Sequence, residues 1–121
     1  MRNDKENAIA KLTLEYSLDI IKYAEVLEKE KKFVIANQLL KSRTSIGANV
    51  REAQNAESKV DFIHKLKIAA KESDETEYWL VLCKLSESYP NPDILEDKLH
   101  VVCKILSKIS IIKKAHIVFS N

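Results

Sequence analysis

Hydrophobic residues recur along this chain at the spacing of one helix face. Between residues 9 and 27 the successive intervals are three, four, four, three and four residues, which is the period of an α-helix and not of a strand. The apolar residues concerned are Ile9, Leu12, Tyr16, Ile20, Tyr23 and Leu27. The pattern predicts a first helix that begins near Asn3 or Asp4 and ends somewhere in the charged run 28–32.

Turn residues mark the limits of the next two helices. A second helix is expected from about residue 32 to residue 55. Ser58, followed three positions later by Asp61, resembles a capping box and predicts that a third helix begins near Lys59. The third helix should end before Pro90, because a residue that precedes proline avoids the helical conformation.

A fourth helix is predicted after the second proline. Asn91 suits the N-cap position and Pro92 the first helical position. Apolar residues then recur at helical spacing as far as Ile109, and the helix could extend to Ala115. These apolar residues are Leu95, Leu99, Val102, Leu106 and Ile109.

The scarcity of turn residues excludes a β-sandwich or barrel. The chain has one Gly and two Pro in 121 residues, whereas such folds need a turn every eight to twelve residues or so. The length corresponds to one domain, residues 1–121. Four long helices with short connections predict an all-α, antiparallel, up-and-down four-helix bundle.

The second helix carries a polar stripe that differs from an ordinary solvated face. Ser, Asn and Gln recur there, although Lys and Glu form helices better and would serve equally well in water. Gly47 lies in the same helix, and small residues on the third helix suggest a close approach of the two. We therefore predict a polar interhelical seam, made of Gln38, Arg43, Ser45, Asn49, Glu52, Glu72 and Glu75.

The third helix contains six consecutive apolar residues, "YWLVLC", at 78–83. Such a run points in every direction around the helix, but a bundle core covers only part of the circumference. The surplus predicts a subunit interface rather than a crowded core of a monomer. The interface residues would be Tyr78, Trp79, Val81 and Leu82.

The total charge of the chain is nearly balanced, but the acidic and basic residues are unevenly distributed along it. There are 20 basic and 18 acidic residues, a net charge of +2, which does not by itself indicate a nucleic-acid-binding protein. The segment from residue 104 onward holds no acidic residue. Its lysines fit either an anionic partner such as RNA or a solvated helix end whose cations complement the helix dipole. They are Lys104, Lys108, Lys113 and Lys114.

Candidate chemistry is weak. A di-metal carboxylate site would need two Glu-x-x-His pairs, but the pairs at 61–64 and 97–100 begin with Asp and fall in the first turns of their helices. Glu72 and Glu75, three residues apart, are more typical of a structural carboxylate pair. One Gly and three His allow no nucleophile elbow and no phosphate-binding loop. We therefore expect no enzyme activity, no metal and no cofactor.

The N-terminal residues, the apolar runs and the cysteine spacing indicate a cellular compartment. The first residues contain no apolar core of a signal peptide, and no apolar run approaches the roughly 18 residues of a membrane span. Cys83 and Cys103 show no CxxC spacing and are typical of buried thiols in a reducing compartment. A cytoplasmic protein without membrane contact is expected.

Residues 38–83 resemble the 23S rRNA intervening-sequence protein family. The most specific segments are "TSIGAN" at 44–49, "DFI" at 61–63 and "KESDET" at 71–76, together with Trp79 and Leu80. The resemblance implies an antiparallel four-helix bundle that assembles as a homopentamer. It also implies a relationship to the accessory protein of diversity-generating retroelements, which binds reverse transcriptase and RNA, although this chain lacks the strongly basic character of that relative.

Two functions remain open at this point. The first is a non-enzymatic, oligomeric accessory module that associates with RNA or with a nucleic-acid-processing protein. The second is a protein-binding scaffold without any nucleic-acid role.

Overall fold

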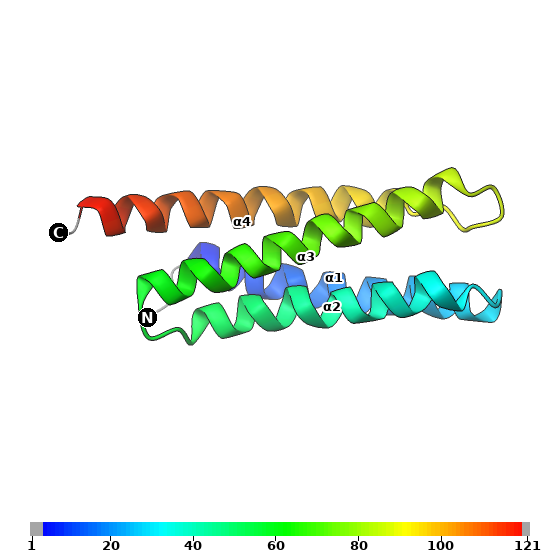
Figure 1. Cartoon of the computed structure of the whole chain (residues 1–121), viewed down its shortest axis with the longest axis horizontal. Helices are drawn as coiled ribbons and strands as arrows, with labels where there is room; N and C mark the ends of the chain where they lie inside the picture. Colours follow the sequence, from blue (N-terminus) through cyan, green and yellow to red (C-terminus); the bar gives the residue numbers. More distant parts are fainter. Residues whose placement is uncertain (1–3, 120–121) are drawn as a thin grey trace.

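The computed structural model describes the backbone of residues 4–119 and the side chains of residues 8–42 and 45–110. Within residues 4–119 the chain forms four helices and no strand, which confirms the all-helical prediction. The helices are α1 (Asp4–Lys29), α2 (Phe33–Gln54), α3 (Lys59–Leu85) and α4 (Asp93–Phe119). They run alternately up and down, with both termini and the α2–α3 turn at one end (Figure 1).

Each helix packs on its neighbours in the chain, and α1 also packs on α4. Over the described residues the diagonal pairs, α1 with α3 and α2 with α4, make no backbone contact, so the helices form a four-membered ring around one core. That core is made of the periodic apolar positions, because a stripe at helical spacing faces one direction only. Its largest fully buried members are Tyr16, Ile9, Ile20, Leu27, Leu39, Ile46, Leu66, Leu80, Leu99 and Leu106.

The predicted caps account for two helix starts. The Asp61 backbone N–H donates to the Ser58 hydroxyl at 3.1 Å, which confirms the cap of α3. The Asp93 N–H donates to the Asn91 side-chain oxygen at 2.8 Å, but α4 begins at Asp93, one residue later than the sequence predicts. The prediction that Asn3 caps α1 lies outside the described residues.

The turn between α1 and α2 uses a lysine where a glycine is usual. Lys31 has a positive φ of 62°. Its N–H donates to the Glu28 carbonyl at 2.9 Å, and the Lys32 N–H donates to the Leu27 carbonyl at 2.8 Å. These two bonds are those of a Schellman motif, which ends a helix abruptly. Because no glycine stands at this place, the sequence pattern located the turn only to within residues 28–32.

Two contacts join the turns at that end of the bundle. The Tyr23 hydroxyl on α1 donates to the carbonyl oxygen of Pro90 at 2.5 Å. The Lys32 ammonium lies 4.9 Å from the centre of the Tyr89 ring, a cation–π contact. The α1–α2 turn is thereby tied to the α3–α4 loop.

Candidate interaction surfaces

The residues of the predicted polar seam lie along the α2–α3 side of the bundle. On α2, Gln38, Ser45 and Asn49 are partly buried and Glu52 is exposed. On α3, Glu72 is partly buried and Glu75 is exposed. The side chain of Arg43 lies outside the described residues.

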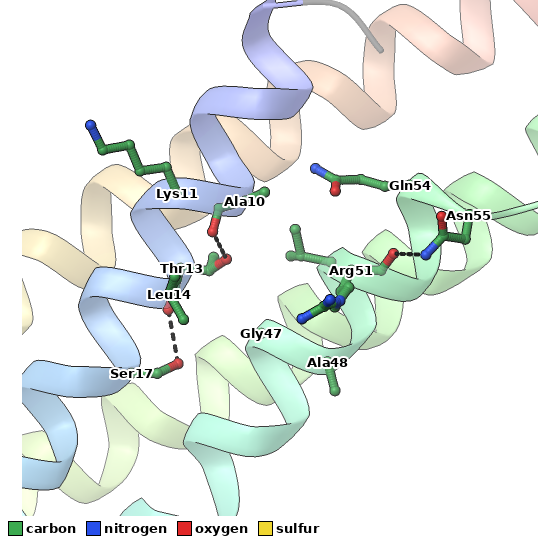
Figure 2. Close-up of a pocket in the computed structure, with 11 residues that line it drawn as sticks. Ala10, Lys11, Thr13, Leu14, Ser17, Gly47, Ala48, Arg51, Gln54 and Asn55 are labelled. Atoms are coloured by element: carbon green, nitrogen blue, oxygen red, sulfur yellow. Dashed lines mark hydrogen bonds between the residues drawn. The ribbon is translucent and has the colours of Figure 1, made fainter. Parts of the chain in front are cut away.

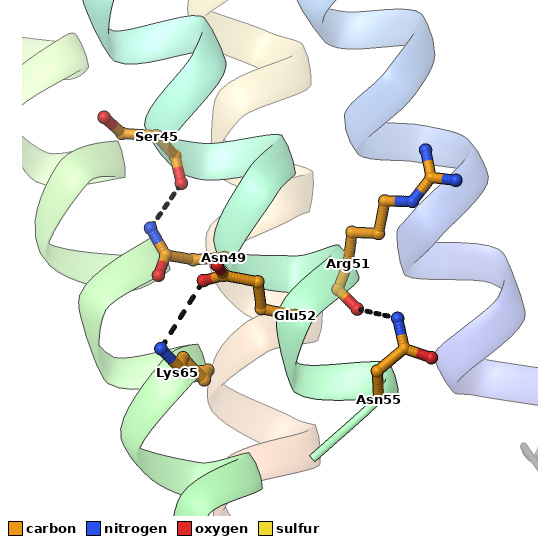
Figure 3. Close-up of polar contacts among 6 residues, drawn as sticks. All are labelled: Ser45, Asn49, Arg51, Glu52, Asn55 and Lys65. Atoms are coloured by element: carbon orange, nitrogen blue, oxygen red, sulfur yellow. Dashed lines mark hydrogen bonds and ion pairs between the residues drawn. The ribbon is translucent and has the colours of Figure 1, made fainter.

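Most hydrogen bonds of the seam stay within their own helix (Figure 3). The Ser45 hydroxyl donates to the Lys41 carbonyl at 3.3 Å, and the Asn49 amide donates to the Ser45 carbonyl at 2.7 Å. The contact that does cross to α3 is the ion pair between Glu52 and Lys65, whose charged atoms are 3.5 Å apart. The two hydrogen bonds of Ser45 and Asn49 are therefore local side-chain-to-backbone bonds of α2.

Four buried Ser and Thr residues also form their hydrogen bonds within their own helix. Each hydroxyl donates to a carbonyl one turn earlier on its own helix, at 2.8 to 2.9 Å, so none needs a partner on another helix. The residues are Thr13, Ser42, Ser73 and Thr76. The polar positions in the middle helices thus serve helix packing and do not converge on a common point.

Gly47 faces a different neighbouring helix from the one that the sequence suggested. The sequence places this glycine on a close approach to the third helix. In the structure a Cβ at position 47 would instead meet the Ser17 hydroxyl of α1, at 3.4 Å. Helix α2 packs on both neighbours, and the periodicity of one helix does not say which neighbour faces which flank.

A groove opens on the α1–α2 face beside this glycine (Figure 2). It has a volume of about 770 Å³ and is bordered by α1 residues 10–17 and α2 residues 47–55. Small residues make up much of its lining, while Lys11 and Arg51 bring positive charge and no carboxylate takes part. Leu14, at its edge, is 64% exposed. The sequence analysis missed this groove; the available signal was Leu14, an apolar residue off the core stripe of the first helix.

The predicted interface residues divide into two pairs. Tyr78 and Val81 project outward and are 59% and 36% exposed, respectively. Trp79 and Leu82 are partly buried, and Trp79 packs against the core, with its ring edge-on to Tyr78 at 5.4 Å between ring centres. The apolar run at 78–83 therefore serves the core with some residues and leaves others in contact with solvent.

Three further large apolar side chains are exposed at the end of α3 and along α4. Leu85 and Ile94 are 76% and 73% exposed on either side of the α3–α4 loop, and Val101 is also exposed. The helices are in register here, because Lys84 pairs with Asp93 at 3.4 Å and Glu77 pairs with His100 at 3.3 Å. Ile94 and Val101 lie one turn on either side of Lys98, which pairs with Asp19 of α1, so these two residues belong to the α1 side of α4. We call the exposed apolar residues of α3 the apolar ridge: Tyr78, Val81 and Leu85.

The other half of the same helix pair is basic. On α4, Lys104 and Lys108 are exposed, as the prediction of an anionic contact requires. On α3, Lys71 and Lys67 are exposed about two and three turns before Tyr78, with the exposed Asp74 between them and the ridge, and the antiparallel register brings the two lysines level with the C-terminal half of α4. These four lysines are the basic patch. Lys113 and Lys114 belong to α4, but their side chains lie outside the described residues.

Comparison with known proteins identifies the family. The sequence profile of the 23S rRNA-intervening sequence proteins matches residues 5–109. This chain belongs to that family. The resemblance seen in residues 38–83 therefore extends over nearly the whole bundle.

A solved structure agrees with this assignment. It is a crystal structure at 1.70 Å of a protein of unknown function from the S23 ribosomal protein family of Bacteroides thetaiotaomicron VPI-5482. The two chains share 40% sequence identity with a TM-score of 0.82, over 88% of this chain and 97% of the other. No protein with a curated description matches this member of the family.

The two cysteine thiols of this family member have raised pKa values. Burial raises the pKa of the Cys83 and Cys103 thiols, which keeps them protonated and poorly nucleophilic. Over the described residues, no group of three or more His, Cys, Asp or Glu side chains is placed to hold a metal ion. Nor, over the same residues, does any helix combine the length and apolar character that a membrane span requires.

Proposed function

We propose that this protein is a non-enzymatic, cytoplasmic accessory module that binds RNA or a nucleoprotein and acts as a homo-oligomer. The observation that carries the RNA part is the basic patch, in which four exposed lysines gather on one half of a single helix pair. Phosphate backbones recognise such a surface through charge, and RNA helices are read largely by shape and phosphate contacts.

Family membership supports the RNA part of the proposal. The family is described by its link to insertions in 23S rRNA, and the solved relative carries a ribosomal family name while its function is unknown. The resemblance to the accessory protein of diversity-generating retroelements points to a reverse-transcriptase complex as one class of nucleoprotein partner. The small net charge of +2 makes one copy a weak RNA binder, so repeated copies of the patch are needed for useful affinity.

The apolar ridge supports the oligomer part of the proposal. Three large apolar side chains exposed along α3 are more than isolated surface residues, and such surfaces mark protein contacts. Five subunits are the number that the resemblance implies. Light scattering of the purified protein measures this directly, since a mass of about 13.9 kDa, that of one chain, would rule out the oligomer.

Fluorescence anisotropy with labelled RNA tests the nucleic-acid part. A structured rRNA fragment, a single-stranded RNA and a duplex DNA are titrated over a salt series. We expect binding that prefers one RNA and weakens steeply with salt, because bound lysines release counterions from phosphates. The double variant Lys104→Glu, Lys108→Glu should weaken that binding, raising the Kd at least tenfold or beyond measurement.

The matched control reverses two lysines outside the patch. Lys22 and Lys29 are exposed on α1, so Lys22→Glu with Lys29→Glu changes net charge by the same amount without touching the patch. Equal loss in both double variants would show that only overall charge matters. Absence of binding to all three nucleic acids at low salt would contradict the RNA role and favour the protein scaffold, to which the apolar ridge also points.

A further inference from the structure

The groove and the apolar ridge lie on opposite faces of the bundle. Helices α1, α2, α3 and α4 follow one another around the ring, so the α1–α2 face that carries the groove is turned away from the α3–α4 face that carries the ridge. The groove is concave and lined by small side chains, and the ridge is built of large exposed ones. The two surfaces are therefore complementary in shape, one concave and the other protruding.

The charges of the two surfaces are complementary as well. Lys11 and Arg51 line the groove, and within the described part of the chain neither forms an ion pair. Beside the ridge, Asp74 is exposed on α3 one turn before Tyr78 and likewise forms no ion pair with a described residue. Unpaired cations beside the groove thus match an unpaired carboxylate beside the apolar ridge.

Packing within one chain does not explain Gly47. A Cβ there would make only an ordinary contact of 3.4 Å with the Ser17 hydroxyl, so alanine fits. Glycine in a helix interior costs about 1 kcal/mol relative to alanine. Because Gly47 borders the groove, the space above its backbone is available to an occupant that comes from outside the chain.

We propose that the α1–α2 groove of one copy receives the apolar ridge of a second copy. The inference rests on the homo-oligomer proposed above and names the two surfaces that form its contact. A contact between opposite, unlike faces is heterologous: every copy keeps one free groove and one free ridge until a ring closes or a filament grows. It therefore explains assembly beyond a dimer without a second kind of interface.

Variants that damage one surface each, followed by mixing, test the arrangement. Ala48→Trp fills the groove from an exposed position on α2, and Tyr78→Lys with Leu85→Lys places cations on the ridge, which the basic groove repels. We expect each variant alone to be a monomer of about 13.9 kDa by light scattering. An equimolar mixture should give a dimer and nothing larger, because one intact groove meets one intact ridge.

Matched controls separate this effect from a general loss of folding. Asn37→Trp adds the same side chain to an exposed α2 position outside the groove, and Val34→Lys with Val60→Lys changes two exposed valines outside the ridge. Both controls should keep the wild-type mass. Circular dichroism and thermal unfolding of the groove and ridge variants check that their helices are intact.

Three outcomes would overturn the inference. If wild type is an oligomer and the groove and ridge variants keep its mass, the oligomer stands and the surfaces named here are wrong. If the variants are monomers but their mixture stays monomeric, the contact is not between groove and ridge. A monomeric wild type would remove the oligomer itself. RNA does not enter the measurement, so failure of the RNA proposal leaves this result unaffected.

Discussion

Tyr16 and Tyr23 lie on the same helix, but their hydroxyl groups have different surroundings. The Tyr23 hydroxyl donates to the Pro90 carbonyl at 2.5 Å. The Tyr16 side chain is 1% exposed, and its hydroxyl has no hydrogen-bond partner among the described residues. A buried polar group without a partner destabilises the fold by about 1–3 kcal/mol. At the scale of single residues, Tyr16 is therefore an exception to the self-satisfied hydroxyls of the core.

Removing each hydroxyl should change stability in opposite directions. Tyr16→Phe is expected to raise the free energy of unfolding by about 1 kcal/mol, because it deletes an unpaired polar atom and keeps the ring. Tyr23→Phe should lower it by about the same amount, because the clasp to Pro90 is lost. Urea unfolding at one fixed protein concentration measures both. A loss of stability in Tyr16→Phe would mean that the hydroxyl does have a partner, such as a buried water.

At the scale of the elements, the α1–α2 turn depends on an unusual backbone conformation. Lys31 adopts a left-handed conformation, φ 62°, to complete the Schellman motif. For a residue with a side chain this conformation costs roughly 1–2 kcal/mol, whereas glycine adopts it freely. The turn forms because the two helices on either side bury apolar faces against each other, and that packing outweighs the local strain.

Lys31→Gly should stabilise the protein. The gain is expected to be about 0.5–1 kcal/mol, since part of the relieved strain is offset by the greater freedom of glycine in the unfolded chain. The matched control is Lys22→Gly at an exposed position inside α1, which should lose about 1 kcal/mol. Thermal unfolding of the two variants at equal concentration compares them. Two equally destabilised proteins would show that the lysine conformation carries no strain.

At the scale of the whole molecule, the buried ionisable groups of the core are neutral in the folded state. Burial raises the pKa of Tyr16 and Tyr23, as well as of Cys83 and Cys103. Unfolding releases these groups to their ordinary pKa values, about 8.5 for Cys and about 10 for Tyr. Above those values the unfolded chain binds fewer protons than the folded one, so rising pH favours unfolding.

Stability should therefore be unaffected by these four groups up to about pH 8 and should fall from about pH 9 upward. Urea unfolding at a series of pH values measures the slope. Tyr16→Phe removes one contributor and should make the decline shallower, whereas Tyr78→Phe, at an exposed position, should leave it unchanged. A free energy of unfolding that stays flat to pH 11 would contradict the assignment.

Local patterns made much of the architecture predictable. The period of Ile9 to Leu27 identified the buried face of α1, and Ser58 identified the start of α3. Both signals lie within a few turns of one helix, where spacing and capping chemistry decide the outcome. The surplus of apolar residues at 78–83 likewise predicted exposed side chains, which the structure shows at Tyr78 and Val81.

The candidate surfaces were only partly predictable, because they combine residues from helices far apart in the sequence. Gly47 was expected to approach α3 and instead lies next to Ser17 of α1. Ile94 and Val101 are exposed like Leu85, but the packing of α4 turns them towards α1 and away from α3. The lysines of α4 gained their α3 counterparts, Lys67 and Lys71, by the antiparallel packing of α3 and α4.

The sequence by itself determined the helices, their approximate limits, their buried stripes and the family. These properties depend on the repeat of side chains around a single helix and on residues within one turn of its ends. Only the tertiary structure decided which flank of each helix meets which neighbour, and hence where the groove, the ridge and the basic patch lie. The reason is physical: a stripe defines the inward direction of a helix, but its rotation and register against a neighbour are set by the packing of both helices together.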